Sequence, residues 1–225
     1  MLLNGFTMKK FFYDNSLSIV FFLLFALAMV GQIYFGLQEY NKDLEDWGGQ
    51  MVNLSAYLTS GHFFEATFEN WESEFLQMAL LVWFTIFLRQ KGSSESKKID
   101  KFNEVDREPS PTRKGAPWAV RKGGLWLKAY NNSLTISLFI LFLLSFALHI
   151  YGSLKDANVE NALRGKPLDS VSSYMSSSRL WFESFQNWQS EFLSIFAIIV
   201  LSIFLRQKGS SQSKPVDASH DETGD

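Results

Sequence analysis

The chain has 225 residues, a formal net charge of −2 and no cysteine. This charge leaves no basic excess of the kind that nucleic-acid binding needs, so no nucleic-acid partner is expected. The absence of cysteine excludes disulfides, thiolate metal sites and thiol catalysis. Phenylalanine (22 residues) and tryptophan (7 residues) are abundant, which suits lipid-facing helices with interfacial anchors.

An internal repeat organises the sequence. The stretch NSLSIVFFLLFALAMVGQIY begins at Asn15 and returns as NSLTISLFILFLLSFALHIY at Asn132. NWESEFLQ at Asn70 returns as NWQSEFLS at Asn187, and FLRQKGSS at Phe87 returns unchanged at Phe204. Each pair lies 117 residues apart, so the two copies align without a gap, and the sequence predicts one membrane hairpin written twice.

Four apolar stretches predict membrane-spanning helices. In chain order they are Leu17–Leu37, Phe75–Leu88, Leu134–Leu154 and Phe192–Leu205. The first and third have about 21 residues each, enough to cross roughly 30 Å of hydrocarbon. The second and fourth have only about 14 uninterrupted residues, so we expect their helices to begin earlier or the bilayer to thin locally.

Basic residues gather on one side of this four-span arrangement. They precede the first span, follow the second and fourth, and fill the connector between the copies, whereas the loop 38–68 is acidic. The positive-inside rule then predicts that both termini are cytoplasmic. Because each copy crosses twice, both have the same orientation, and we expect a pseudo-two-fold axis along the membrane normal.

The predicted fold is therefore an all-α membrane protein with four transmembrane helices formed by two parallel helical-hairpin repeats. Its predicted parts are a first repeat (1–91), a flexible basic cytoplasmic connector (92–129), a second repeat (130–208) and a disordered polar tail (209–225). The end of the connector, PWAVRKGGLWLKAY, suits a segment lying on the inner leaflet, or an ordinary juxtamembrane stretch. Anionic inner-leaflet lipids are expected partners.

Polar residues shared by the copies mark a candidate intramembrane layer. Glu74 and Glu191 are equivalent and lie 15 residues outward from Arg89 and Arg206, or roughly 22 Å along a helix. Asn70 and Asn187 share their helix face, and Gln32 and His149 are expected at the same depth. Glu69 and Glu72 differ between the copies, where Gln186 and Gln189 replace them, and we therefore expect these positions to be exposed.

Two interpretations of this layer stay open. In one, Asn70 and Asn187 are helix N-caps and the two glutamates lie in the first turn, close to headgroup water. In the other, Glu74 and Glu191 face each other and share a proton or a cation, with His149 as a partner. Trp71, Trp188, Arg89 and Arg206 are read as interfacial anchors in both.

The motifs NWxSEFL and FLRQKGS, together with YLTSGHFFEATFENWESEFLQ, resemble a bacterial membrane family, the domain of unknown function 6766 family. The resemblance covers nearly the whole chain and implies a bacterial integral membrane protein of the inner membrane, without an assigned activity or assigned residues. The second copy departs from the motif at Arg179, where the first copy has His62.

The sequence favours a structural or interaction component of the membrane, as a homo-oligomer or with other membrane proteins. The alternative is a small proton or cation pathway through the polar layer. No phosphate loop, metalloprotease motif or nucleophile elbow is present, so neither an enzyme nor a cofactor or metal site is expected. A lipid-binding protein is the third possibility, supported only by the basic inner face.

Overall fold

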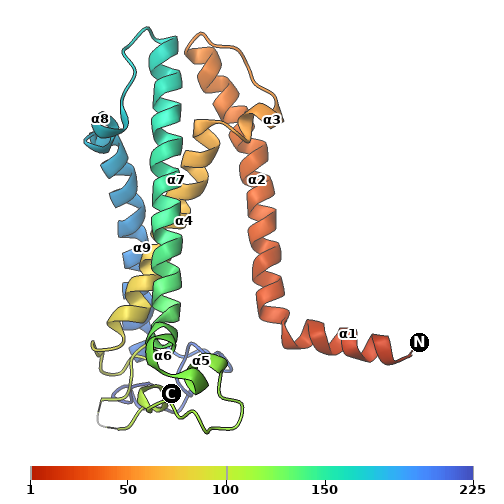
Figure 1. The fold of residues 1–225 in the computed structure, drawn as a ribbon, viewed down its shortest axis with the longest axis vertical. Coiled ribbons are helices and arrows are strands. Elements are labelled where there is room, and N and C mark those ends of the chain that lie inside the picture. Colours follow the sequence, from red (N-terminus) through yellow and green to blue (C-terminus); the bar gives the residue numbers. More distant parts are fainter. Residues whose placement is uncertain (1, 100, 225) are drawn as a thin grey trace. The chain divides into compact units, whose positions relative to one another are not determined.

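The computed structural model describes residues 2–99 and 101–224, and these residues form helices and turns but no strand (Figure 1). Four helices are long: α2 (Ser16–Asp46), α4 (Gly61–Phe84), α7 (Ser133–Leu163) and α9 (Ser178–Phe204). The all-helical prediction is confirmed for the described residues. The shorter elements are α1 (Leu2–Asp14), α3 (Leu54–Tyr57), the 3₁₀ helix η1 (Glu104–Asp106), α5 (Trp118–Lys122), α6 (Gly124–Asn131) and α8 (Val171–Met175).

Helix boundaries recur with the same offset as the sequence motifs. Helices α2 and α7 both have 31 residues, and both their first and their last residues lie 117 positions apart. Local hydrogen bonds recur as well. The Asn41 side chain donates to the Val52 carbonyl (3.0 Å) and accepts from the Val52 amide (2.7 Å). The equivalent Asn158 side chain makes the same two hydrogen bonds, at the same lengths, with the backbone of Asp169.

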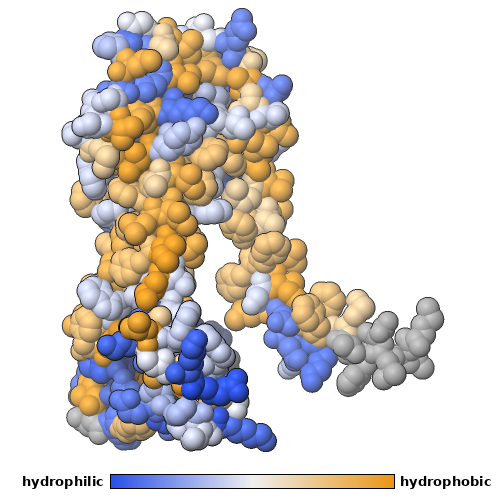
Figure 2. Space-filling view, viewed as in Figure 1, coloured by the Kyte–Doolittle hydropathy of each residue, from blue (hydrophilic) through white to orange (hydrophobic). Residues whose placement is uncertain are grey.

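Three helices are long and apolar enough to cross a membrane: α2, α7 and α9. Their apolar stretches are almost entirely exposed, with 0%, 17% and 6% of the residues buried, and the exposed side of α2 is orange along most of its length in Figure 2. The fourth predicted span, in α4, does not join them because Glu69, Glu72 and Glu74 fall within every 18-residue stretch of that helix. Helices α4 and α9 do begin well before Phe75 and Phe192, as their short apolar runs require.

The chain divides into two compact units, of which the first comprises Met1–Glu65 and Tyr151–Ser170. Its core is formed by Tyr40, Leu44 and Tyr57, with Phe63 and Val159 among the residues packed against them. This division does not follow the two repeats, and the domain boundaries given above stay a prediction.

Glycines let two helices of the first unit touch backbone to backbone. A Cβ atom on Gly152 of α7 would lie 2.8 Å from the carbonyl carbon of Phe64, and one on Gly61 would lie 2.6 Å from the Gly152 carbonyl oxygen. Real Cβ atoms essentially never come this close to backbone. Small residues allow such close crossings, as they do between membrane helices.

The second unit comprises Ala66–Ile150 and Val171–Asp225 and includes the connector and the tail. In the connector, the Lys122 ammonium lies over the rings of Trp118 (4.8 Å) and Trp126 (4.9 Å). The tail is tied to the start of the connector, since the Gly92 amide donates to Thr223 Oγ1 (2.8 Å) and the Gly224 amide donates to the Ser93 carbonyl (3.0 Å). The flexible connector and the disordered tail remain predictions that no observation here tests.

Candidate functional site

A histidine inside α7 is the centre of the most buried polar cluster in the second unit. The side chain of His149 is fully buried, and so is that of Glu72 from α4. His149 Nδ1 lies 3.1 Å from Glu72 Oε2, within hydrogen-bonding distance. On the opposite edge of the ring, His149 Nε2 lies 3.6 Å from Glu183 Oε2, which belongs to α9. Each nitrogen of the imidazole therefore faces a carboxylate, one from each neighbouring helix.

The second oxygens of these carboxylates are also engaged. Trp188 Nε1 donates to Glu72 Oε1 (3.3 Å), which joins α9 to α4 directly. Arg179 Nε donates to Glu183 Oε1 (2.9 Å) one helical turn away. The contact between His149 Nε2 and Glu183 Oε2 is different, because both atoms are buried and neither has a hydrogen-bond partner. These two atoms therefore face each other without forming a hydrogen bond.

A third carboxylate borders the cluster. Glu69 lies one turn before Glu72 on α4 and accepts a short hydrogen bond from Asn187 Nδ2 of α9. Its charge interacts with those of His149, Glu72 and Glu183. We call these seven residues the His149 cluster: His149, Glu72, Glu183, Glu69, Arg179, Asn187 and Trp188.

The charges of the cluster do not balance when every carboxylate is ionised. Three carboxylates then face one guanidinium and one imidazole, so protonating His149 still leaves one negative charge in excess. An uncompensated charge inside a protein or membrane is costly, and proteins avoid that cost by protonating a group. The cluster is therefore chemically suited to gain and lose a proton.

This cluster exists once in the chain, although the hairpin sequence is written twice. The cluster uses residues of both copies, and the positions equivalent to them hold no matching acids or cation apart from one histidine. The equivalents of His149, Glu72, Glu69, Glu183 and Arg179 are, in that order, Gln32, Gln189, Gln186, Ala66 and His62. The expectation that Glu69 and Glu72 are merely exposed is wrong, because Glu72 is fully buried and Glu69 is half-buried.

The shared glutamates of the predicted layer lie elsewhere. Glu74 is exposed and Glu191 is partly exposed, and their charges act on each other. They are therefore brought near one another, but outside the His149 cluster. Gln32 lies in α2, which belongs to the first compact unit.

The N-cap interpretation of Asn70 and Asn187 is wrong. Helix α4 begins nine residues before Asn70, at Gly61, and α9 begins nine residues before Asn187, at Ser178. The N-cap of α9 is Ser177, whose side chain accepts from the Leu180 amide (3.4 Å). A mid-helix asparagine is free to reach a neighbouring helix, which is what Asn187 does.

The other predicted residues have mixed surroundings. Trp71 packs edge-on against Phe68 (5.2 Å between ring centroids), whereas Trp188 belongs to the His149 cluster. Arg89 and Arg206 each cap the end of their helix, since Nη1 donates to three backbone carbonyls in both cases. Among the described residues, no group of three or more His, Cys, Asp or Glu side chains is placed to hold a metal ion.

The fold and the cluster define an all-helical protein with three helices able to cross a membrane and an acid–histidine network buried between α4, α7 and α9. The chain belongs to the family described as domain of unknown function (DUF6766), whose model matches residues 8–225. This confirms the resemblance drawn from the motifs. Comparison with curated proteins and with solved structures gives no match.

Proposed function

We propose that the chain is a four-span protein of the bacterial inner membrane, in which α2, α4, α7 and α9 cross and both termini are cytoplasmic. The location of its acids supports α4 as the fourth span. Of its four glutamates, Glu65 and Glu72 are buried, Glu69 is half-covered and paired with Asn187, and Glu74 is exposed. Acids that face the interior of a bundle cost much less than acids that face lipid.

We further propose that this protein binds and passes on a proton at the His149 cluster. The observation that carries the proposal is a fully buried imidazole whose two nitrogens each face a carboxylate oxygen. Ionisable groups buried in a membrane bundle are typical of proton relays. Glu74 and Glu191 lie outside this cluster, at more exposed positions.

Protonation changes how the helices are joined. A neutral imidazole has one N–H and donates to one carboxylate, whereas the imidazolium donates to both. Uptake of a proton by His149 therefore closes the 3.6 Å gap to Glu183 and adds a bond between α7 and α9. Loss of the proton opens it again, so proton occupancy and helix contact are coupled.

The equivalent repeat positions supply the test variants. Gln32 and Gln189 stand at the positions equivalent to His149 and Glu72, so His149→Gln and Glu72→Gln install side chains that the chain already uses there. The protein is reconstituted in liposomes, a pH gradient is imposed, and the internal pH is followed with a fluorescent dye. We expect the double variant to slow proton movement by about a hundredfold, in line with the loss of a positioned acid–base group.

The matched control is the double variant Glu74→Gln and Glu191→Gln. Slower proton movement in this variant alone would move the relay to the shared pair and refute the role of His149. No proton movement with the unmodified protein would refute the relay altogether.

A structural role is the second candidate, and a particular observation favours it. Trp188 and Asn187 of α9 donate to Glu72 and Glu69 of α4, and such polar contacts hold membrane helices together. In that case the variants lower the thermal midpoint and the unmodified protein moves no protons. The exposed apolar faces would then serve contacts with a second copy, with other membrane proteins or with anionic lipids.

A further inference from the structure

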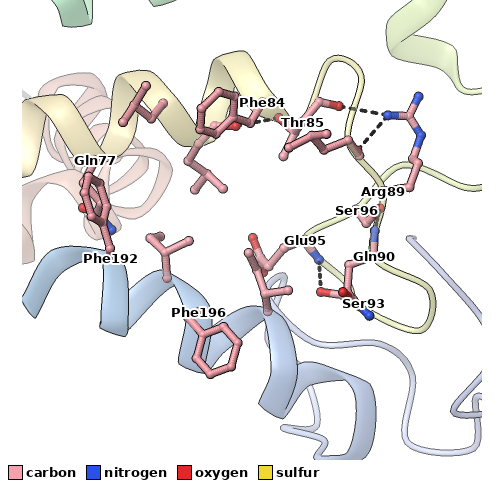
Figure 3. A pocket seen from close by; sticks show the side chains of 15 residues that line it. Gln77, Phe84, Thr85, Arg89, Gln90, Ser93, Glu95, Ser96, Phe192 and Phe196 are labelled. Atoms are coloured by element: carbon pink, nitrogen blue, oxygen red, sulfur yellow. Dashed lines mark hydrogen bonds between the residues drawn. The ribbon is translucent and has the colours of Figure 1, made fainter. Parts of the chain in front are cut away.

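An apolar groove runs between α4 and α9 in the second unit and ends at the loop after α4 (Figure 3). Its volume is about 550 Å³, within the range of small-molecule sites. The two helices line it with leucine, isoleucine and phenylalanine, including Leu81, Phe84, Phe192 and Phe196. At the loop end the lining turns polar, with Arg89, Gln90, Ser93 and Glu95. The groove is therefore apolar along the two helices and charged at the loop end.

The cation at this end differs from its equivalent in the other copy. Arg89 and Arg206 cap their helices in the same way, through Nη1. In Arg206 the tail occupies Nη2, which donates to the backbone carbonyls of Ala218 (3.1 Å) and Ser219 (3.5 Å), while the buried Nε has no hydrogen-bond partner. In Arg89, Nη2 and Nε donate to no group among the described residues. The first copy thus keeps a guanidinium edge available for an acceptor, at the end of the groove.

The same end also carries a negative charge. Glu95 lines the groove with Arg89, and its carboxylate accepts from Ser94 Oγ (3.5 Å). A singly anionic head group would meet this carboxylate unfavourably, whereas a head group with a phosphate and an ammonium matches both charges. Guanidinium binds phosphate oxygens through paired N–H donors.

We propose that the groove binds a phosphatidylethanolamine-type phospholipid. One acyl chain lies between α4 and α9, the phosphate binds the open edge of Arg89, and the ammonium lies at Glu95. The segment Gln77–Phe84 of α4 that lines the groove is roughly 10 Å long, which accommodates part of one acyl chain.

This inference rests on the membrane location proposed above, but not on the proton relay. Membrane fractionation of the expressed protein reports the location separately. A protein that stays in the membrane and lacks lipid preference would therefore overturn this inference alone.

The test is native mass spectrometry of the purified full chain after detergent exchange and addition of three lipids with identical acyl chains. These lipids carry ethanolamine, choline or glycerol head groups. We expect the ethanolamine lipid to be retained best, because choline lacks N–H donors and the glycerol lipid has a net negative charge. Arg89→Gln should weaken its binding by about tenfold or more, the scale of a lost charge-assisted hydrogen bond.

Two further variants sharpen the assignment. Glu95→Gln should shift the preference from the ethanolamine lipid toward the glycerol lipid, because it removes the group that distinguishes them. Arg206→Gln is the matched control and should leave lipid retention unchanged. Equal retention of the three lipids, an equal loss in Arg206→Gln, or a lipid-free dimer that occupies the groove would each overturn the proposal.

Discussion

Adding one methyl group at Gly152 tests the close helix crossing of the first unit. The new Cβ would lie 2.8 Å from both the carbonyl carbon and the Cβ of Phe64, well inside the 3.4–4 Å of ordinary contact. Backbone cannot swing aside as a side chain can, so we place the cost at about 3 kcal/mol, the upper end for overpacking. Alanine recovers about 1 kcal/mol of helix propensity. Gly152→Ala should therefore lower the free energy of unfolding by about 2 kcal/mol.

Gly31 is the matched control, because it is also a helix-interior glycine but has nothing within 4 Å of its missing Cβ. Gly31→Ala should stabilise the protein by about 0.5–1 kcal/mol through propensity alone. The two variants are compared by thermal unfolding in detergent, followed by circular dichroism. Opposite signs are expected. If Gly152→Ala is as stable as Gly31→Ala, the backbone contact between α4 and α7 does not exist.

Three further predictions concern single side chains. The buried Tyr57 hydroxyl has no hydrogen-bond partner, and burial raises the pKa of Tyr57 above its ordinary value of 10.0. The unfolded chain then ionises more readily, so stability falls as pH rises past this value. Tyr57→Phe should lessen that loss in a thermal titration and leave stability at pH 7 unchanged. The Lys214 ammonium donates to the carbonyls of Ser219 (3.1 Å), His220 (3.2 Å) and Glu222 (2.8 Å). Lys214→Ala should therefore speed protease cleavage within residues 209–224. An unchanged cleavage rate would instead support the prediction of a disordered tail. Asn41→Ala and Asn158→Ala should each lower the free energy of unfolding by about 1–2 kcal/mol, because each removes two equivalent hydrogen bonds to the backbone. A large difference between the two variants would contradict the equivalence of the two loops.

Run length predicted α2 and α7 because their apolar side chains face outward, where the sequence pattern reports the surroundings directly. It failed to delimit α4 and α9, which begin 14 residues before Phe75 and Phe192, and α4 shows a physical reason. Glu72 and Ser73 interrupt its apolar run, yet both are buried, at 0% and 2% exposure. Polar groups that are covered by protein do not end a helix, and a count of consecutive apolar residues has no information about what covers them.

The candidate site was only partly accessible from the sequence. Depth along the helix selected His149 as a candidate, and its side chain is fully buried. Comparison of the copies then selected Glu74, whereas the partner is Glu72, two residues away and on the other side of the helix. A usable signal was present on α9, where Arg179, Glu183 and Asn187 are spaced by four and share one face.

The comparison of copies selected Glu74 and Glu191 because it favours identical positions, whereas the His149 cluster lies at positions that differ between the copies. Here the acid–histidine pair, Glu72 of the first copy with His149 of the second, corresponds to two amides, Gln189 and Gln32. Amides hydrogen-bond like their partners but do not titrate. Of the two pairs, only Glu72 with His149 can therefore take up a proton. The same reasoning separates Arg89 from Arg206, since they cap their helices identically and differ only in the edge that the tail covers. In both cases the two copies share the same helices, and the proposed site lies where the copies differ.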